Sequence, residues 1–397
     1  MRVLVTTESF LPTINGVTNS VCKVLDHLAL RGHEATVMVP NAGAPASYAG
    51  FPVVEVPSLP YRQFPVGLPG THVQRRLEEF RPDVVHVASP FLLGAEAIAA
   101  AKRLGIPSVA IFQTDVAGYA RRNHLAAASA LAWRIMRRIH RDASLTLVPS
   151  SATMADLERA GLTSLERWGR GVDLAAYHPR NRATDAARLL RTEFSPRGEV
   201  VVGYVGRIAP EKQLERMSAL RGIPGIRLVI VGGGPALPAV RRALGGIPVS
   251  YLGELRGEAL AAAYASFDIF LHTGEAETFG QTIQEAHAAG LPVIAPRAGG
   301  PIDLVDHGID GFLYSPGAGR DAQRELRGAV ELLARDPGLR RRMGEAGRRA
   351  VLGRGWENVC DELLGHYGRV MRPATGAEQI TFAVLKPQRK TILKARQ

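Results

Sequence analysis

Two basic side chains follow a short apolar run at a spacing that suits an anionic ligand. Residues 200–205 are predicted to form a buried strand, and Gly206, Arg207 and Lys212 come after it. Gly206 allows close backbone approach, while Arg207 supplies a planar fork of donors and Lys212 a mobile point charge. Pro210 suits the first turn of a helix whose N-terminus would point at the same place. Such a pair can hold a diphosphate as charge builds on it, although an isolated pair at this spacing is usually a solvated surface pair.

Two carboxylates eight residues apart form the strongest local pattern. Glu277 lies in a segment that runs into a predicted helix, and Glu285 lies in that helix. At about 1.5 Å of rise per residue, eight helical residues span roughly 12 Å, so the carboxylates could bind opposite ends of one ligand. A nucleotide sugar has hydroxyl groups at both ends. The alternative for Glu285 is an exposed helix residue, since Ile283, Ala286 and Ala289 mark the packed side.

Polar residues also follow apolar runs in the first half of the chain. Asn15 and Gly16 open a predicted helix whose free amides could meet a phosphate, and a purely structural turn is an equally good interpretation. His86, Gln113 and Asp115 stand near the ends of two further runs and are candidates for the acceptor side of a site. A lone histidine is more often structural than catalytic, so the interpretation of His86 stays open.

Apolar runs of strand length alternate with amphipathic segments along the chain. The candidate residues above lie in or near the loops that follow these predicted strands. The alternation predicts an α/β protein of two tandem, doubly wound parallel sheets, whose ligands bind at the carboxyl ends of the strands. We expect the first domain to span 1–178 and the second to span 199–355. Residues 179–198 lack strong periodicity and are expected to link the domains. The predicted strands are 3–5, 35–39, 84–87, 108–112, 145–148, 200–205, 227–231, 249–252, 269–272 and 292–295.

The C-terminal part of the chain divides into a helix and a tail. Residues 356–371 are predicted to form an amphipathic helix that packs back toward the first domain. Residues 372–397 are basic and hold few large apolar side chains, so this tail is predicted to be disordered. The packed side of the helix is predicted from Val359, Leu363, Leu364 and Tyr367.

Composition narrows the class of protein. The chain has 397 residues, of which 46% are hydrophobic, and its formal net charge is +12, which suits two domains and an anionic partner. Cys22 and Cys360 stand far apart in unrelated contexts, which argues against a disulfide framework and favours a reducing cytoplasm. A strand begins at once, so we expect no signal peptide. The longest apolar stretch has about half the ~20 residues that a membrane span requires.

Taken together, these motifs resemble glycosyltransferase family 4, whose members have the two-domain GT-B fold with the active site in the cleft between the domains. The resemblance extends from Met1 to about Met371. Segments 8–12, 15–21, 113–116 and 359–367 look like the actinobacterial GDP-mannose-dependent α-mannosyltransferases. The resemblance is carried by Asn15-Gly16, Arg170-Gly171-Val172-Asp173, Gly206-Arg207, Glu211-Lys212, Glu277 to Glu285 and Gly299-Gly300.

The resemblance implies roles for the matching residues. Arg207 and Lys212 would hold the diphosphate, Glu277 the sugar hydroxyls and Glu285 the ribose, while the loop that begins at Gly253 would lie near the nucleobase. The implied catalytic set is Arg207, Lys212, Glu277 and Gln113. The implied donor-binding set is Asn15, Gly16, Gly206, Arg207, Lys212, Gly253, Glu254, Leu255, Glu277, Phe279, Gly280, Gln281 and Glu285.

This chain departs from the family pattern at two positions. Many members have a histidine where Gln113 stands, and glutamine forms hydrogen bonds but cannot transfer a proton. We therefore expect Gln113 to position hydroxyl groups. Many members also have an H-x-H-x-P pattern, of which this chain keeps only the first histidine, His86.

The resemblance implies transfer of mannose from GDP-mannose to a lipid-linked acceptor, such as a glycolipid or a phosphatidylinositol mannoside or lipoglycan precursor. The α-configuration would be retained by front-side displacement, with the departing phosphate accepting the acceptor's proton. The chain contains no D-x-D motif, so we expect neither a metal nor another cofactor.

Three other functions are weighed against this one. A UDP-sugar transferase acting on diacylglycerol-type lipid remains open, because the phosphate site does not distinguish bases. A GT-B nucleotide-sugar epimerase would need acid–base pairs, which Gln113 disfavours. Nucleic-acid binding would rest on charge alone, because no aromatic platform accompanies the arginine runs.

The run from Arg121 to Arg141 mixes apolar and basic residues at helical spacing. A basic amphipathic helix can lie on anionic lipid. We therefore expect a cytoplasmic protein in peripheral contact with the inner face of the plasma membrane. The residues concerned are Trp133, Arg134, Ile135, Met136, Arg137, Arg138, Ile139 and Arg141.

Overall fold

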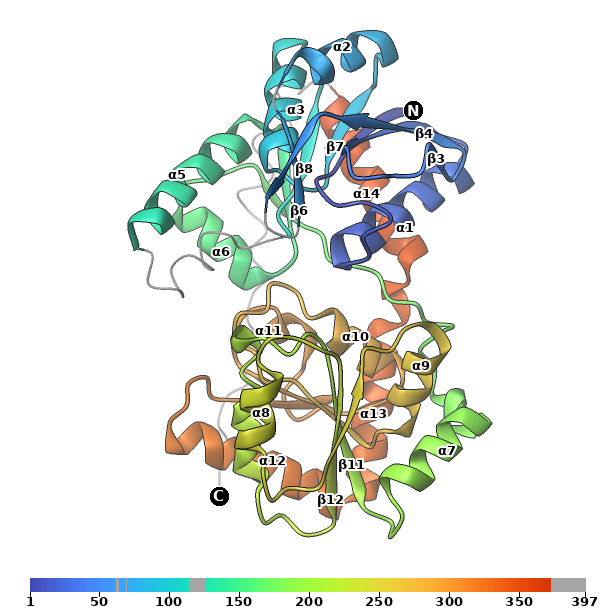
Figure 1. Ribbon diagram of the computed structural model, residues 1–397, viewed down its shortest axis with the longest axis vertical. Helices are drawn as coiled ribbons and strands as arrows, with labels where there is room; N and C mark the ends of the chain where they lie inside the picture. The colour runs from blue at the N-terminus through green and yellow to red at the C-terminus, as the bar shows by residue number, and fades with distance from the viewer. Residues whose placement is uncertain (62–63, 69, 114–125, 373–397) are drawn as a thin grey trace, which may run out of the picture.

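The computed structural model describes residues 1–61, 64–68, 70–113 and 126–372, which form two α/β domains (Figure 1). The first domain is built on an eight-stranded sheet in the order β10-β9-β8-β7-β1-β2-β4-β3, parallel except at the antiparallel β3–β4 edge. A separate hairpin pairs β5 with β6. The strands are β1 (Arg2–Thr6), β2 (Glu34–Pro40), β3 (Ser47–Tyr48), β4 (Phe51–Val56), β5 (Ser58–Tyr61), β6 (Phe64–Gly67), β7 (Val84–Val87), β8 (Ser108–Ile111), β9 (Leu145–Val148) and β10 (Leu165–Arg167).

The second domain has a six-stranded sheet in the order β13-β12-β11-β14-β15-β16, and every pair in it is parallel. Its central strands are buried on both faces, as expected for a parallel sheet covered by helices. The strands are β11 (Val200–Val205), β12 (Ile226–Val231), β13 (Val249–Gly253), β14 (Ile269–Leu271), β15 (Val293–Pro296) and β16 (Gly311–Tyr314).

Helices cover the two sheets, and none among the described residues is long and apolar enough to cross a bilayer. The first domain carries α1 (Gly16–Leu30), α2 (Thr71–Phe80), α3 (Leu92–Arg103), α5 (Ala126–Asp142) and α6 (Ser151–Arg159). The second domain carries α7 (Asp185–Phe194), α8 (Leu237–Ala243), α9 (Gly257–Ser266), α10 (Gln281–Ala288), α11 (Pro301–Leu304), α12 (Arg320–Arg335) and α13 (Pro337–Val351), followed by α14 (Trp356–Met371); the short 3₁₀ helices are η1 (Pro179–Ala183), η2 (Pro210–Lys212), η3 (Leu214–Leu220) and η4 (Leu352–Arg354).

All ten strands predicted from apolar runs are present, with ends that differ by at most a residue or two. The prediction missed β3, β4, β5, β6, β10 and β16. β10 is a three-residue edge strand without a buried side chain, and β3 has two residues. β16 begins at Gly311, where a Cβ would lie 2.1 Å from the carbonyl oxygen of Val293, so a larger residue would collide at the start of this strand.

Residues 179–198 were predicted to be a linker without strong periodicity, but much of this segment is helical. They contain η1 and the helix α7, whose Ala187 and Phe194 are buried in the second domain. Arg191 bonds to Asp268, next to β14, and to the backbone oxygens of Ser266 and Glu199. Few apolar side chains pack this helix against the domain, and the hydrogen bonds of Arg191 hold it in place as well. The polar composition therefore concealed it.

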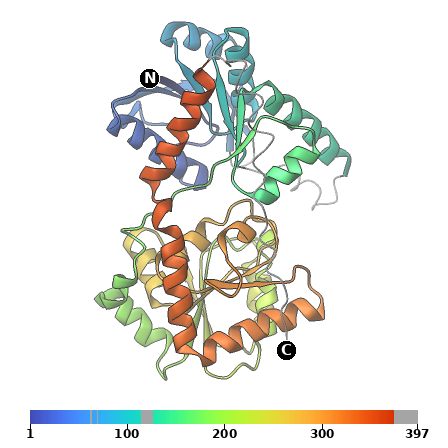
Figure 2. The same cartoon turned by 180° about the vertical axis from the view of Figure 1, so that it is seen from behind.

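The chain crosses between the domains at two neighbouring segments. Val172 forms a β-bridge with Gly355, and the Trp168 indole donates to the Val359 carbonyl at 2.8 Å. Beyond this crossing α14 runs along the back of the first domain (Figure 2). Its Val359, Leu363 and Tyr367 are buried in the first domain's core, in agreement with the predicted packed side, and Leu364 is partly buried.

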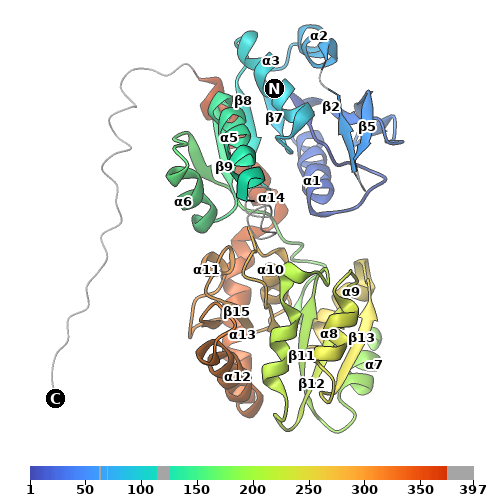
Figure 3. The ribbon, with the colours of Figure 1, turned by 60° about the vertical axis from the view of Figure 1, so that its left-hand side comes forward.

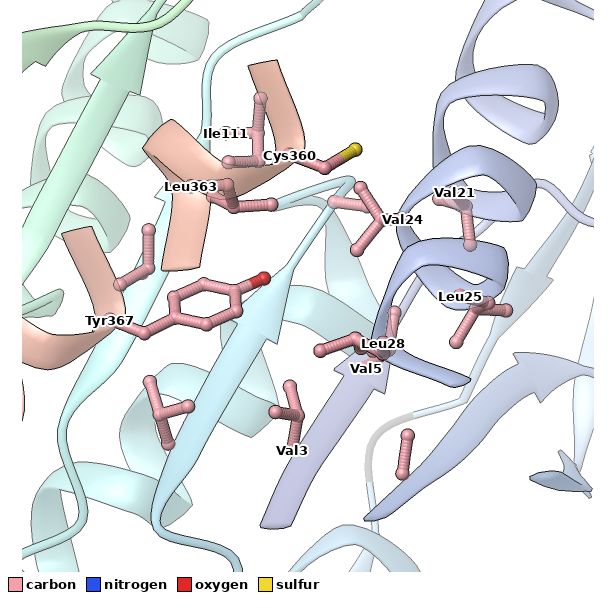
Figure 4. Packing of buried hydrophobic residues seen from close by; sticks show 14 of the residues in the cluster. Val3, Val5, Val21, Val24, Leu25, Leu28, Ile111, Cys360, Leu363 and Tyr367 are labelled. Carbon is pink, nitrogen blue, oxygen red and sulfur yellow. The ribbon is translucent and has the colours of Figure 1, made fainter. Parts of the chain in front are cut away.

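The core beneath α14 joins the chain's last helix to its first (Figure 4). Cys360 and Leu363 of α14 lie near Val24 of α1, and Tyr367 belongs to the same core cluster as Val3 and Val5 of β1. The last helix thus belongs to the first domain's core although it follows the second domain in sequence. The predicted tail, apart from Arg372, lies outside the described residues.

Candidate active site

The loops after β11, β12 and β13 meet at one edge of the second sheet. Gly206 follows β11 with φ +151°, and a Cβ on Gly232 would lie 1.9 Å from the Gly206 carbonyl oxygen. Gly253 accepts a hydrogen bond from the Gly232 amide at 2.7 Å, and Glu254 lies beside Gly233. Leu255 packs on the second domain's core. The structure therefore brings the predicted phosphate loop and the predicted base loop together.

The glycine run from Gly232 to Gly234 joins these loops, and sequence reasoning missed it. A Cβ on Gly234 would lie 2.3 Å from the Ile208 carbonyl oxygen, so side chains are excluded there. Three glycines directly after a predicted strand were the available signal, because such a run favours close backbone approach.

The helix expected after Arg207 is only a three-residue 3₁₀ turn, η2, so that prediction was wrong. Gln213 has φ +53° and ends the turn immediately after Lys212. Lys212 points toward the loop after β14, while the Arg207 side chain is 65% exposed and lies 3.9 Å from Glu211. The two cations share a loop but do not converge in this structure.

Lys212 and Glu277 form a partly buried ion pair. Lys212 Nζ lies 2.6 Å from Glu277 Oε2, and the side chains are 22% and 17% exposed. Burial alone would raise the pKa of Glu277, but the Lys212 ammonium and His272 outweigh it and lower this pKa to about 2. The Thr273 hydroxyl fixes the loop by donating to the Lys212 carbonyl at 2.7 Å.

Glu277 and Glu285 do not lie on one helix, because α10 begins only at Gln281. The 12 Å spacing argument therefore fails, although both carboxylates border the same loop. Glu285 is half-buried and accepts a hydrogen bond from the Tyr264 hydroxyl at 2.8 Å. Burial raises the pKa of Glu285 to about 7 against the effect of Tyr264. The alternative of a freely exposed helix residue is thus excluded.

The loop between these carboxylates packs under a second loop. The Gly300 amide donates to the Glu277 carbonyl at 2.7 Å, and a Cβ on Gly300 would lie 2.1 Å from the Phe279 carbonyl oxygen. Gly280 has φ +108°, which suits glycine, at the start of α10. The Gln281 side chain donates to the Gly171 carbonyl at 3.1 Å, so it contacts the crossing segment.

The first domain supplies Asn15, Gly16 and Gln113 to the same region. Asn15 Oδ1 caps α1 by accepting from the amides of Val17 and Thr18 at 2.9 and 3.0 Å, so these two amides already have a partner. A Cβ on Gly16 would lie 2.6 Å from Nη1 of Arg170, which sequence reasoning named only as part of a motif.

Gln113 is held by two contacts. Its amide oxygen accepts from Arg170 Nη2 at 2.6 Å, and its Nε2 donates to the Ala88 carbonyl at 3.2 Å. Burial lowers the pKa of Arg170, and the Glu277 carboxylate opposes that effect. Arg170 is therefore electrostatically coupled to the second-domain site while it touches two first-domain residues.

His86 does not belong to the acceptor side, which corrects that interpretation. It is 2% exposed, and its Nδ1 shares a 2.7 Å hydrogen bond with the Tyr367 hydroxyl of α14. Burial lowers the pKa of His86 to about 3, so the ring is neutral. His86 lies in the middle of β7, whereas a ligand would bind beyond its end. Asp115 falls outside the described residues.

Solved structures with the same architecture are glycosyltransferases. The Anabaena protein HepE in complex with UDP and glucose aligns with a TM-score of 0.72 at 21% identity, covering 92% of this chain and 99% of that one. Sucrose-phosphate synthase from Thermosynechococcus elongatus aligns with a TM-score of 0.75 at 20% identity, covering 93% and 98%. The fold and the arrangement of its loops define the GT-B class.

Sequence comparison then defines the family. Residues 14–176 match Glycosyltransferase Family 4, and residues 187–350 match Glycosyl transferases group 1. A GDP-mannose-dependent alpha-mannosyltransferase of Mycolicibacterium smegmatis is 47% identical, with 94% of this chain and 98% of the relative covered, and one of Mycobacterium tuberculosis is 45% identical, with 93% and 97% covered. The chain belongs to glycosyltransferase family 4, and the predicted resemblance is confirmed.

Proposed function

We propose that this chain transfers mannose from GDP-mannose to a lipid-linked acceptor and retains the α-configuration. The observation that carries the proposal is the identity of 47% and 45%, over nearly the full length of both chains, to relatives named GDP-mannose-dependent alpha-mannosyltransferases. The Lys212–Glu277 pair beside a glycine-lined loop gives this activity a site.

The residues suit front-side displacement. The bond from the sugar carbon to the diphosphate breaks, its electron pair stays on the phosphate oxygen, and the acceptor hydroxyl attacks from the same face and passes its proton to that oxygen. Lys212 exchanges part of its contact with Glu277 for the diphosphate, and Glu277 then accepts hydrogen bonds from sugar hydroxyls. Preorganised charges of this kind stabilise a leaving group as its charge grows.

The chemistry as proposed needs no metal. Lys212, together with Arg207 once its exposed side chain reorients, would supply the positive charge that the leaving group needs. Activity that is insensitive to EDTA and to added Mg²⁺ would agree with this, and loss of activity in EDTA would contradict it.

The lipid-linked acceptor is supported by more distant relatives. An alpha-monoglucosyldiacylglycerol synthase of Acholeplasma laidlawii is 27% identical over 79% of this chain and 85% of that relative. A phosphatidylinositol dimannoside mannosyltransferase of Mycobacterium tuberculosis is 27% identical over 77% of this chain and 82% of that relative. We place the protein in the cytoplasm, in peripheral contact with the inner face of the plasma membrane.

The helix α5 offers a basic face for that contact but not the free apolar face expected from its sequence. Its Trp133 and Met136 pack on the core formed with Phe112, and among the α5 side chains that the structure describes, Ile135 is the large apolar one that is exposed, at 52%. The contact is therefore proposed to be electrostatic. The exposed basic residues are Arg134, Arg137, Arg138 and Arg141, and the part of the run before residue 126 lies outside the described residues.

One incubation tests the donor, the acceptor class and the stereochemistry. The full chain is mixed with labelled GDP-mannose and total membrane lipid, and the lipid product is isolated and digested with an α-mannosidase. We expect a labelled lipid that releases mannose. A matched reaction with labelled UDP-glucose is the control, and labelling by UDP-glucose alone would replace the proposal with a UDP-sugar transferase.

A further inference from the structure

Arg170 is held from both domains, through its guanidinium on one side and its backbone carbonyl on the other. Its Nη2 donates to Gln113 Oε1 of the first domain at 2.6 Å, and the backbone carbonyl of Arg170 accepts from Gln284 Nε2 of α10 at 2.8 Å. Arg170 also lies on the segment where the chain passes between the domains, two residues before the Val172–Gly355 bridge. Its position is therefore set by the interdomain contact.

Gln113 is already engaged at both ends of its amide. The oxygen faces Arg170 and the nitrogen faces the Ala88 carbonyl. A flip would place the NH₂ group against the guanidinium, so the hydrogen-bond pattern fixes one orientation. This arrangement orients the arginine and does not present the glutamine to a sugar.

Gly16 leaves the room that the guanidinium occupies. A side chain there would collide with Arg170, because its Cβ would lie 2.6 Å from Nη1. On the other side of the cleft, Glu277 is paired with Lys212. Among the described residues no carboxylate lies within ion-pair distance of Arg170, so its charge is available to an anion from the first-domain side.

We propose that Arg170 is a third cation of the donor site, which binds the diphosphate from the first-domain side, and that Gln113 and Gly16 position it. This inference rests on the proposed nucleotide-sugar transfer. Arginine is always charged and offers a planar fork that matches phosphate oxygens. As the bond from sugar to diphosphate breaks, the N–H groups donate to the oxygens that gain the electron pair, and the guanidinium keeps its protons.

The decisive measurement compares nucleotide binding with nucleoside binding. Calorimetry is done with GDP and with guanosine on the parent, Arg170→Ala and Arg170→Lys, alongside turnover of GDP-mannose. We expect Arg170→Ala to lose on the order of 10²-fold in turnover. It should also lose about tenfold in GDP affinity with guanosine affinity unchanged, because a charge-assisted hydrogen bond is worth about 1.5–3 kcal/mol. Arg170→Lys should retain part of both, and free guanidinium should partly restore Arg170→Ala.

Gln113→Leu tests the positioning role. It should lower turnover about tenfold with a smaller change in KM, because the arginine remains but its orientation is lost. Arg159→Ala is the matched control, since Arg159 is an exposed arginine of α6 paired with Asp156. It should leave turnover and both affinities unchanged.

Two results would overturn the assignment. The first is an Arg170→Ala variant with parental turnover and parental GDP affinity. The second is an inactive variant that binds GDP normally and gains nothing from guanidinium, which would show a structural role. If Arg170→Ala does not fold, the ratio of GDP to guanosine affinity in Arg170→Lys decides the question. If the parent shows no mannose transfer, binding of GDP, UDP and their nucleosides still tests Arg170.

Discussion

At the scale of single residues, the site is a set of charges that satisfy one another until a substrate arrives. Glu277 would be costly to bury alone, and Lys212 keeps it ionised. A diphosphate brings two further negative charges and competes for the same ammonium. If the proposed function holds, the Lys212–Glu277 pair both stabilises the loop and binds the substrate's diphosphate.

Replacing Lys212 with alanine should lower turnover more than donor affinity. The ammonium stabilises charge that develops mainly as the sugar–phosphate bond breaks, so we expect a loss on the order of 10²-fold in turnover. The variant also leaves Glu277 without its partner, so the pKa of Glu277 should rise. Steady-state kinetics with saturating donor measures the effect, and Arg324→Ala on the exposed side of α12 is the control. Near-parental turnover in Lys212→Ala would refute the role.

Arg207 should behave differently from Lys212, although their sequence context is similar. Its side chain is 65% exposed and only loosely paired with Glu211, so it must reorient to reach a diphosphate. We expect Arg207→Ala to raise the donor KM and to reduce turnover less than Lys212→Ala does. Equal losses of turnover in the two variants, measured side by side, would contradict this difference.

Glu285 should make donor binding depend on pH near neutrality. Burial raises its pKa to about 7, so the group passes from acid to carboxylate between about pH 6 and 8. A carboxylate accepts ribose hydroxyls better than the acid, so affinity for GDP-mannose should rise with pH through this range. GDP-mannose is used because its phosphates do not titrate there. Glu285→Gln should abolish the change, and an unchanged pH profile would contradict it.

The same pKa gives a second readout with the opposite sign. The folded pKa of Glu285 lies above the usual 4.5, so the folded state holds the proton more tightly than the unfolded state does. The contribution to stability is complete below about pH 4.5 and is lost as pH rises through about 7. The melting temperature of the parent, measured relative to that of Glu285→Gln, should therefore be higher at pH 5 than at pH 8.

The contact between the loops that carry Lys212 and Glu277 could be predicted from the sequence because the loops after parallel strands meet at one edge of a sheet. Arg170 could not, because it stands in an irregular segment and its neighbours Gln113 and Glu277 come from different domains. His86 was misplaced for a related reason. Its burial depends on α14, which lies 281 residues away in sequence at Tyr367.

At the scale of secondary structure, apolar runs predicted the buried strands well and failed where polar contacts hold an element. The helix α7 was hidden because Arg182 and Arg191 fasten it through Asp268 and backbone oxygens. The short turn η2 was misjudged because a left-handed residue after Lys212 cannot be inferred from the proline that begins it. Local composition does not record such long-range partners.

The basic face of α5 should bind anionic membranes. Changing Arg134, Arg137, Arg138 and Arg141 to serine should weaken binding to vesicles that contain acidic lipid by on the order of 10²- to 10³-fold, since each surface cation contributes about 1 kcal/mol. Binding should also fall with salt. Flotation measures it. The control variant loses the same number of positive charges from another surface. It carries serine at four exposed arginines of α12 and α13, namely Arg324, Arg335, Arg341 and Arg349.

Two outcomes would contradict an electrostatic contact through α5. One is equal binding of the parent to neutral vesicles at any salt concentration. The other is an equal loss in the α12 and α13 control, which would show that only net charge matters. Arg75 and Arg76 are not part of this face, because Arg75 pairs with Glu79 of its own helix and Arg76 packs over the Phe80 ring.

At the scale of the whole molecule, the two sheets followed from repeated apolar runs, but their mutual placement depends on contacts that no periodicity shows. The crossing at Val172 and Gly355 is one such contact. A second lies where α6 of the first domain faces α11 of the second (Figure 3). There Asp303 accepts from the Ser151 amide at 2.6 Å, and Arg167 Nη1 lies 3.0 Å from its other oxygen.

Asp303 should stabilise the approach of the domains on this side of the cleft. Its carboxylate is 14% exposed and has two first-domain partners, and the neighbouring Gly300 amide holds the Glu277 carbonyl. Asp303 therefore connects the domain contact, through Gly300, to the loop that carries Glu277. Asp303→Ala removes both charge-assisted bonds, which should disfavour this arrangement by about 1–3 kcal/mol because Arg167 is partly exposed.

We expect Asp303→Ala to have a larger radius of gyration by small-angle scattering and a turnover several-fold lower, with a melting temperature close to that of the parent. The affinity of Asp303→Ala for the donor should change little, because Lys212 and Glu277 of the second domain remain paired. Arg167→Ala should reproduce part of the effect, since it removes one of the two partners, whereas Asp321→Ala, an exposed pair on α12, should do nothing. An unchanged radius together with parental turnover would show that the contact does not hold the domains together, and the crossing segments alone would then have to do so.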